Sequence, residues 1–169
     1  MNKEDISPIL IFFHIGSRDS LSTTESLFRI GKDMTITLFD IRLENLTDYD
    51  GFITYYKDHF EIPISVIKSC LSNTVGKKMF HIGISPGYGS PYITNPNMRH
   101  WTHVNNHKWG DMDTICDSIV MDTTTMDELY TNKKIEMPNF LSIDAQGAEY
   151  DILEASIEAL KGDVVGIVT

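Results

Sequence analysis

Cysteine and basic residues are both scarce in this chain of 169 residues. Two cysteines, Cys70 and Cys116, are too few for a disulfide framework, and no Cys/His cluster has zinc-finger spacing. The 14 Lys and Arg residues are outnumbered by 24 Asp and Glu, for a formal net charge of -10. This balance argues against sequence-independent binding to nucleic acid and against docking on anionic membranes, because both need clustered positive charge.

Long apolar runs are missing as well. No run approaches the roughly 20 residues that span a bilayer, and the N-terminal M-N-K-E-D-I-S-P lacks the basic and apolar regions of a secretory signal. We therefore expect a cytoplasmic protein. With 41% hydrophobic and 22% charged residues, the composition suits a globular protein, and the length suits one domain over residues 1–169.

The first half of the chain alternates predicted strands and helices, as in α/β folds. Residues 9–15, I-L-I-F-F-H-I, are a nearly continuous apolar run that predicts a buried strand. A capping box beginning at Ser22 predicts a helix, and residues 34–41 predict a second, parallel strand. Residues 46–60 are weakly helical. Residues 64–71 predict a third strand, and residues 77–84 look like its hairpin return.

The next segments are less regular. Residues 85–107 hold three prolines and three histidines without a clear period and predict a long loop. His103 and His107 are spaced as zinc ligands only if the segment is helical, and the two asparagines between them argue against a helix, so we expect no metal site. Residues 118–123 predict a short strand. A capping box at Thr125 predicts a short helix.

The clearest pattern covers residues 139–156, N-F-L-S-I-D-A-Q-G-A-E-Y-D-I-L-E-A-S. Residues 140–143 predict a buried strand, and from Ala148 apolar residues share one face of a helix that should end at Gly162. Ligands of open α/β sheets bind at the carboxyl ends of strands. The alternative is an ordinary turn whose acids are favoured by the helix dipole. The polar residues at this strand end, our candidate catalytic residues, are Asp144, Gln146 and Glu149.

A second candidate site follows the first strand, in H-I-G-S-R-D-S at residues 14–20. Gly16 lets a ligand approach the backbone, because a glycine has no Cβ. A dinucleotide fingerprint needs G-x-G-x-x-G here, and its other glycines are missing, which disfavours a nicotinamide-dependent oxidoreductase. Asp40 ends the second strand, where a carboxylate can accept hydrogen bonds from a ribose diol. For His14, a packed strand-end histidine is the alternative.

Together these segments resemble the FkbM family of S-adenosylmethionine-dependent methyltransferases, from about residue 10 to residue 169. I-D-A-Q-G-A-E-Y-D-I-L looks like the family's signature strand, turn and helix start. C-L-S-N, ending at Asn73, resembles a segment near the adenine, although the family has an acid there. V-M-D-T-T-T-M-D-E-L resembles the segment before the signature strand, where Asp122 or Asp127 could face the cleft. His14 and Ser20 replace the family's first acid and second glycine, which puts cofactor affinity in doubt.

The resemblance implies a Rossmann-like class I methyltransferase fold: α/β, with a mainly parallel, doubly wound sheet. Because residues 163–169, D-V-V-G-I-V-T, predict another buried strand, we expect the chain to be the N-terminal part of a longer domain, incomplete at its C-terminus. The implied reaction is methyl transfer from S-adenosylmethionine to an oxygen of a small molecule or sugar. The rivals are a degenerate domain of the same fold and an NAD-dependent oxidoreductase. The candidate cofactor-binding residues are His14, Gly16, Asp19, Asp40 and Asn73.

Overall fold

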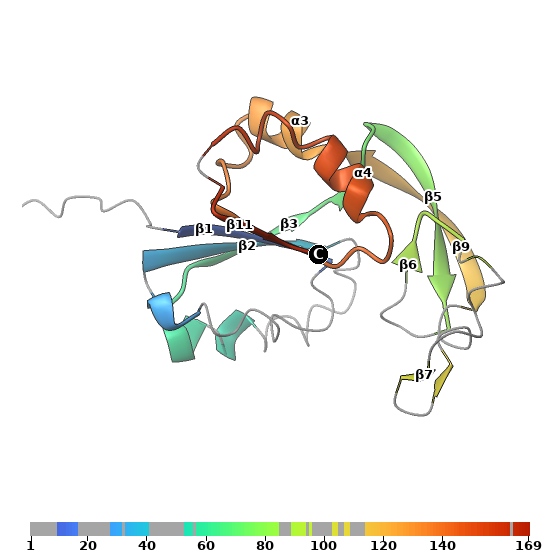
Figure 1. Cartoon of the computed structure of the whole chain (residues 1–169), viewed down its shortest axis with the longest axis horizontal. Coiled ribbons are helices and arrows are strands. Elements are labelled where there is room, and N and C mark those ends of the chain that lie inside the picture. The colour runs from blue at the N-terminus through green and yellow to red at the C-terminus, as the bar shows by residue number, and fades with distance from the viewer. Residues whose placement is uncertain are drawn as a thin grey trace, which may run out of the picture.

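The computed structural model contains a central parallel sheet, a second sheet beside it and several short helices (Figure 1). No helix in the described part of the chain is both long and apolar enough to cross a membrane. The structure describes residues 10–16, 28–31, 33–40, 53–55, 57–84, 89–93, 95, 103–104, 107–108, 114–162 and 164–169.

The central sheet has five strands in the order β11-β10-β1-β2-β3, and every neighbouring pair is parallel. This confirms the predicted α/β fold with a mainly parallel sheet. The order reverses at β1: the chain leaves β1 toward β2 and β3, and later returns to its other side with β10. Such a switch point opens a crevice at the carboxyl ends of the strands. The strands are β1 (Leu10–Ile15), β2 (Met34–Asp40), β3 (Ile64–Lys68), β10 (Phe140–Ile143) and β11 (Gly166–Val168).

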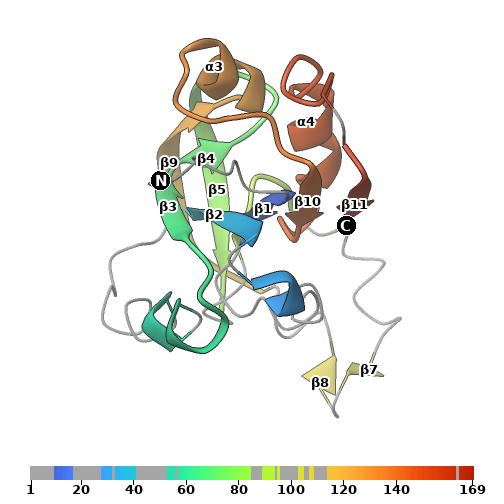
Figure 2. The same cartoon turned by 90° about the vertical axis from the view of Figure 1, so that its left-hand side faces the viewer.

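Apolar residues cover both faces of this sheet, as expected for parallel strands. Phe13 on β1 is 1% exposed and packs toward α3 (Met126–Thr131) and α4 (Glu149–Glu154). Its neighbour Phe12 is fully buried in a second cluster that includes Phe28 on the other face. Figures 1 and 2 agree that α3 and α4 lie on one side of the sheet and the helical turns at residues 28–31, 53–55 and 57–60 on the other.

The expected hairpin between residues 64–71 and 77–84 is wrong. The predicted strand divides: β3 completes the central sheet, and β4 (Cys70–Leu71) enters the second sheet, whose order is β4-β9-β5-β6. There β9 (Ile115–Thr124) lies between β4 and β5 (Gly76–Gly83), so β5 pairs with a distant strand. The predicted strand at 118–123 is thus the middle of a longer one.

Other boundaries also differ from the sequence predictions. The predicted loop at 85–107 contains β6 (Gly89–Ser90) and a small antiparallel ladder of β7 (His103–Val104) with β8 (His107–Lys108), which extends just past it. α4 ends well before Gly162 because the chain turns at residues 155–160. β11 is the edge of the described sheet, so Ile167 is 44% exposed and the predicted burial of this strand is wrong. The capping box at Ser22 lies outside the described residues.

Candidate functional site

Three expected site residues end neighbouring strands at one edge of the central sheet. Ile15 on β1 is in register with Phe39 on β2 and with Ile143 on β10. The residues that directly follow these three are Gly16, Asp40 and Asp144, which are therefore level with one another at the edge of the sheet. The backbone nitrogen of Gly16 donates to the carbonyl of Phe39 at 3.1 Å, and that of Asp144 donates to the carbonyl of Ile15 at 2.9 Å. β1 and β10 are therefore neighbours, and their polar turns lie on one side of the sheet.

Gly16 is required by the close approach of the β10 backbone. Its φ is +84°, and a Cβ added to it would lie 1.9 Å from the carbonyl oxygen of Asp144. L-residues disfavour this φ, and no side chain fits at that distance. The glycine therefore lets the two strand ends on either side of the switch point come together.

The acidic turn after β10 is held by its own side chains. The Glu149 carboxylate accepts hydrogen bonds from the backbone nitrogens of Ala145 at 2.9 Å and Gly147 at 3.1 Å. The Gln146 amide donates to Asp144 at 2.9 Å, and Gln146 itself has a φ of +46°. Asp144, Gln146 and Glu149 are thus brought together as expected. Glu149 stabilises the turn, whereas Asp144 is exposed at the strand end.

The expected cofactor-binding residues fall into different environments. His14 is 2% exposed, with its ring nearly parallel to that of Phe12 at a centroid distance of 6.4 Å. This is the packed strand histidine that we weighed as the alternative. Asp19 and Ser20 lie outside the described residues, and for Asp40 the structure gives the backbone position alone.

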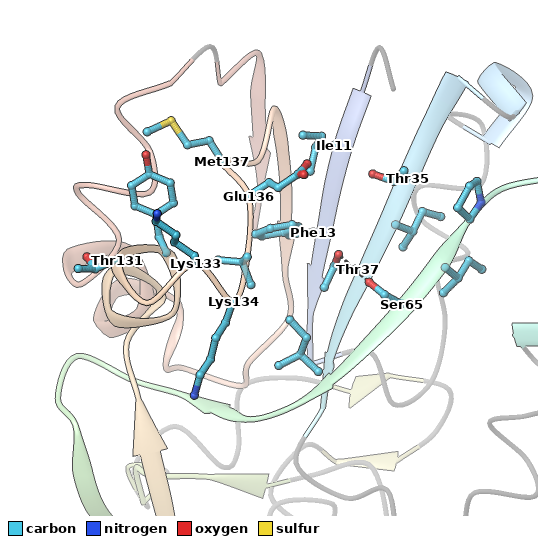
Figure 3. A pocket seen from close by; sticks show the side chains of 16 residues that line it. Ile11, Phe13, Thr35, Thr37, Ser65, Thr131, Lys133, Lys134, Glu136 and Met137 are labelled. Atoms are coloured by element: carbon cyan, nitrogen blue, oxygen red, sulfur yellow. Dashed lines mark hydrogen bonds between the residues drawn. The ribbon is translucent and has the colours of Figure 1, made fainter. Parts of the chain in front are cut away.

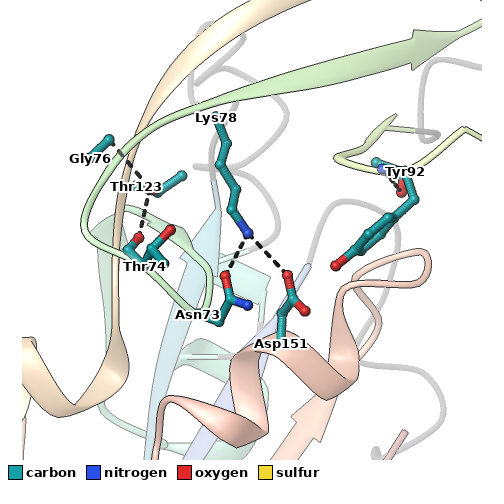
Figure 4. A network of polar contacts seen from close by, with 8 residues as sticks. Asn73, Thr74, Gly76, Lys78, Tyr92, Thr123 and Asp151 are labelled. Atoms are coloured by element: carbon teal, nitrogen blue, oxygen red, sulfur yellow. Dashed lines mark hydrogen bonds and ion pairs between the residues drawn. The ribbon is translucent and has the colours of Figure 1, made fainter.

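Asn73 belongs to a polar network that the sequence does not reveal (Figure 4). The Lys78 ammonium donates to the Asn73 side-chain oxygen at 2.6 Å and to the Asp151 carboxylate at 3.1 Å. The Asp151 side chain is only 8% exposed. One signal in the sequence could have revealed this network. Asp151 directly precedes Ile152, which belongs to the apolar face of the predicted helix, and a carboxylate buried there needs a partner.

The segment from Ser90 to Tyr92 packs over the acidic turn, and sequence reasoning missed it too. The Ser90 hydroxyl donates to the Gln146 carbonyl at 2.8 Å and accepts from the Tyr92 backbone nitrogen at 3.0 Å. Figure 4 shows the Tyr92 hydroxyl on the side of Asp151, and hydrogen bonding to that carboxylate is the main cause that raises the pKa of Tyr92. Tyr92 lies beside the turn with 48% of its surface exposed.

Other candidates have structural environments. Burial raises the pKa of the Cys70 thiol to about 12, although the charge of Lys78 lowers it, so Cys70 is a neutral thiol at physiological pH. The Asp127 carboxylate accepts from the backbone nitrogen of Ala159 at 2.8 Å. Asp122 is an exposed residue of β9 opposite Lys77. Thr125 caps α3 by accepting from the Glu128 nitrogen at 3.0 Å, which confirms the N-cap of the predicted capping box, while the Glu128 carboxylate accepts from the Thr124 hydroxyl at 2.6 Å.

A cleft of about 1100 Å³ lies on the α3 side of the central sheet (Figure 3). Its floor includes Thr37 and Ser65, whose hydroxyls are 3.0 Å apart, and its rim includes Lys133 and Lys134. Among the expected site residues whose side chains the structure describes, none lines this cleft. Because α/β sheets bind ligands at the carboxyl ends of their strands, the edge formed by Gly16, Asp40 and Asp144 is the better candidate site.

Comparison with known proteins identifies the family. The family model described as the methyltransferase FkbM domain matches residues 59–168. No curated protein and no solved structure matches the chain. The matched range is well over half of the chain and contains Asn73, Lys78 and the acidic turn, whereas Gly16 and Asp40 precede it. The fold is that of a class I methyltransferase, and the chain belongs to the FkbM methyltransferase family.

Proposed function

We propose that the protein is an S-adenosylmethionine-dependent methyltransferase that acts on an oxygen of a small molecule or sugar. The observation that carries the proposal is the alignment of Gly16, Asp40 and Asp144 at the switch point of the sheet. An edge of this kind is where α/β folds bind ligands. The family of the chain supports methyl transfer.

The residues at this edge fit the proposed cofactor by their chemistry. Asp40 would accept hydrogen bonds from the ribose diol, and Asn73 would contact the adenine. S-adenosylmethionine supplies a methyl group already activated by its sulfonium. The chain's own tasks are to align the acceptor and to remove its proton. We assign removal of the acceptor's proton to Asp144, because Gln146 cannot accept a proton at neutral pH and Glu149 holds the turn through two backbone nitrogens. Asp144 is exposed at the strand end, where it accepts from the Gln146 side chain.

We expect the dissociation constant for S-adenosylhomocysteine to be at least about tenfold lower than that for NAD. A nicotinamide dinucleotide needs the close pyrophosphate approach that the missing glycines would have provided. Titration calorimetry with each ligand, followed by direct competition, measures the preference. Tighter binding of NAD would refute the methyltransferase proposal, and binding of neither ligand would favour a degenerate domain.

Replacing Asp40 with alanine should weaken S-adenosylhomocysteine binding by roughly 30- to 150-fold. The change removes two charge-assisted hydrogen bonds, together about 2–3 kcal/mol after partial solvation. The melting temperature should change little, because a strand-end acid is not part of the core. Normal affinity with a melting temperature many degrees lower would instead make Asp40 a structural residue.

A further inference from the structure

The contact between Lys78 and Asn73 determines which end of the Asn73 amide is left for a ligand. An ammonium group has three donors and no acceptor. The Asn73 atom that faces it at 2.6 Å is therefore the side-chain oxygen, as Figure 4 shows. The amide nitrogen lies on the other side of the group. Asn73 is thus oriented to donate a hydrogen bond to a ligand.

Lys78 is itself held in place by partners from another part of the fold. Its ammonium forms an ion pair with Asp151 on α4, and the Lys78 side chain is 25% exposed. Asp151 also interacts with Tyr92, whose pKa it raises. Moving Lys78 away from Asn73 would leave a nearly buried carboxylate without its cation, which is costly.

We propose that Lys78 is a positioning residue that makes Asn73 read a ring nitrogen of adenine and not its 6-amino group. This inference rests on the proposed function, because it takes Asn73 to contact the adenine. Adenine ring nitrogens accept hydrogen bonds, whereas the 6-amino group donates them. Because the Asn73 oxygen faces the Lys78 ammonium, the amide presents its two N–H donors away from Lys78, and these donors pair with acceptors.

The test compares S-adenosylhomocysteine with its analogue lacking the 6-amino group, by titration calorimetry. The wild-type protein should bind the two ligands within about threefold of each other. Lys78→Met releases the amide oxygen, which can then rotate to accept from the 6-amino group, so S-adenosylhomocysteine should become preferred by about tenfold. The ratio is the readout, because simple destabilisation would weaken both ligands equally.

Two control variants isolate the role of Lys78. Lys77→Met removes the neighbouring lysine, which is exposed on the opposite face of β5, and should leave the ratio unchanged. Lys78→Arg keeps a side chain that only donates hydrogen bonds, so this variant should also preserve the ratio of the two affinities. If Lys78→Met does not fold, Asn73→Asp serves instead: a carboxylate has no donor, so both ligands should bind about tenfold more weakly.

Several results would overturn the inference. A wild-type protein that already prefers S-adenosylhomocysteine by tenfold, or a Lys78→Met ratio equal to the wild-type ratio, contradicts the assigned orientation. Undiminished affinity of the Asn73→Asp variant for S-adenosylhomocysteine would also contradict the assigned orientation. If the wild-type protein binds neither ligand, the proposed function fails and this inference fails with it. If it binds both but the ratios do not respond, the inference alone fails.

Discussion

Replacing Gly16 with alanine is expected to lower the free energy of unfolding by about 4 kcal/mol. Alanine at a φ of +84° costs about 1–2 kcal/mol. The added Cβ would also lie 1.9 Å from the Asp144 carbonyl oxygen, where a backbone must move, and overpacking of this kind costs about 1–3 kcal/mol. Urea denaturation of the wild-type protein and the variant measures the difference.

Gly76 offers a matched control for this substitution. Its φ is +143°, but a Cβ there would have nothing within 4 Å. Gly76→Ala should therefore lose only the conformational part, about 1–2 kcal/mol. Equal losses in the two variants would show that the approach of the Asp144 backbone to Gly16 contributes nothing to stability.

Replacing Glu149 with alanine should lower the free energy of unfolding by about 3 kcal/mol. The carboxylate accepts two backbone hydrogen bonds within the acidic turn, and hydrogen bonds to charged groups contribute about 1.5–3 kcal/mol each. The total is reduced because the turn is partly exposed. Thermal and urea unfolding at neutral pH provide the measurement.

Glu149→Gln separates a structural role from a catalytic one. The amide oxygen of glutamine still accepts hydrogen bonds, so this variant should lose only about 1 kcal/mol. A proton acceptor, in contrast, would be disabled equally by either substitution without loss of stability. If the alanine variant were as stable as the wild-type protein, Glu149 would again be a candidate base.

Local patterns allowed the prediction of the elements that carry the candidate site. The apolar runs of β1 and β10 fix where these strands end, and so which residues share the edge of the sheet. The capping box at Thr125 predicted the start of α3 because its hydrogen bond joins residues three apart. The order of these segments also indicated the family.

The remaining features depend on partners far apart in the sequence. Lys78 and Asp151 are 73 residues apart, and no local period links them. The pairing of β5 with β9 could not be predicted for the same reason, because a hairpin return and a strand awaiting a distant partner have the same alternating pattern. The contact of Ser90 with the acidic turn likewise joins segments 56 residues apart.

The position of β10 beside β1 also has a consequence for the order of folding. Ile11 and Asn139, which bond at the start of this strand pair, are 128 residues apart. A growing chain emerges at about 5–20 residues per second, so β1 can pair with β2, and β2 with β3, well before β10 is synthesised. During that interval one edge of β1 has no strand from its own sheet. An apolar strand with an open edge is prone to aggregation, so a nascent chain of this sequence is most vulnerable just before Phe140 leaves the ribosome.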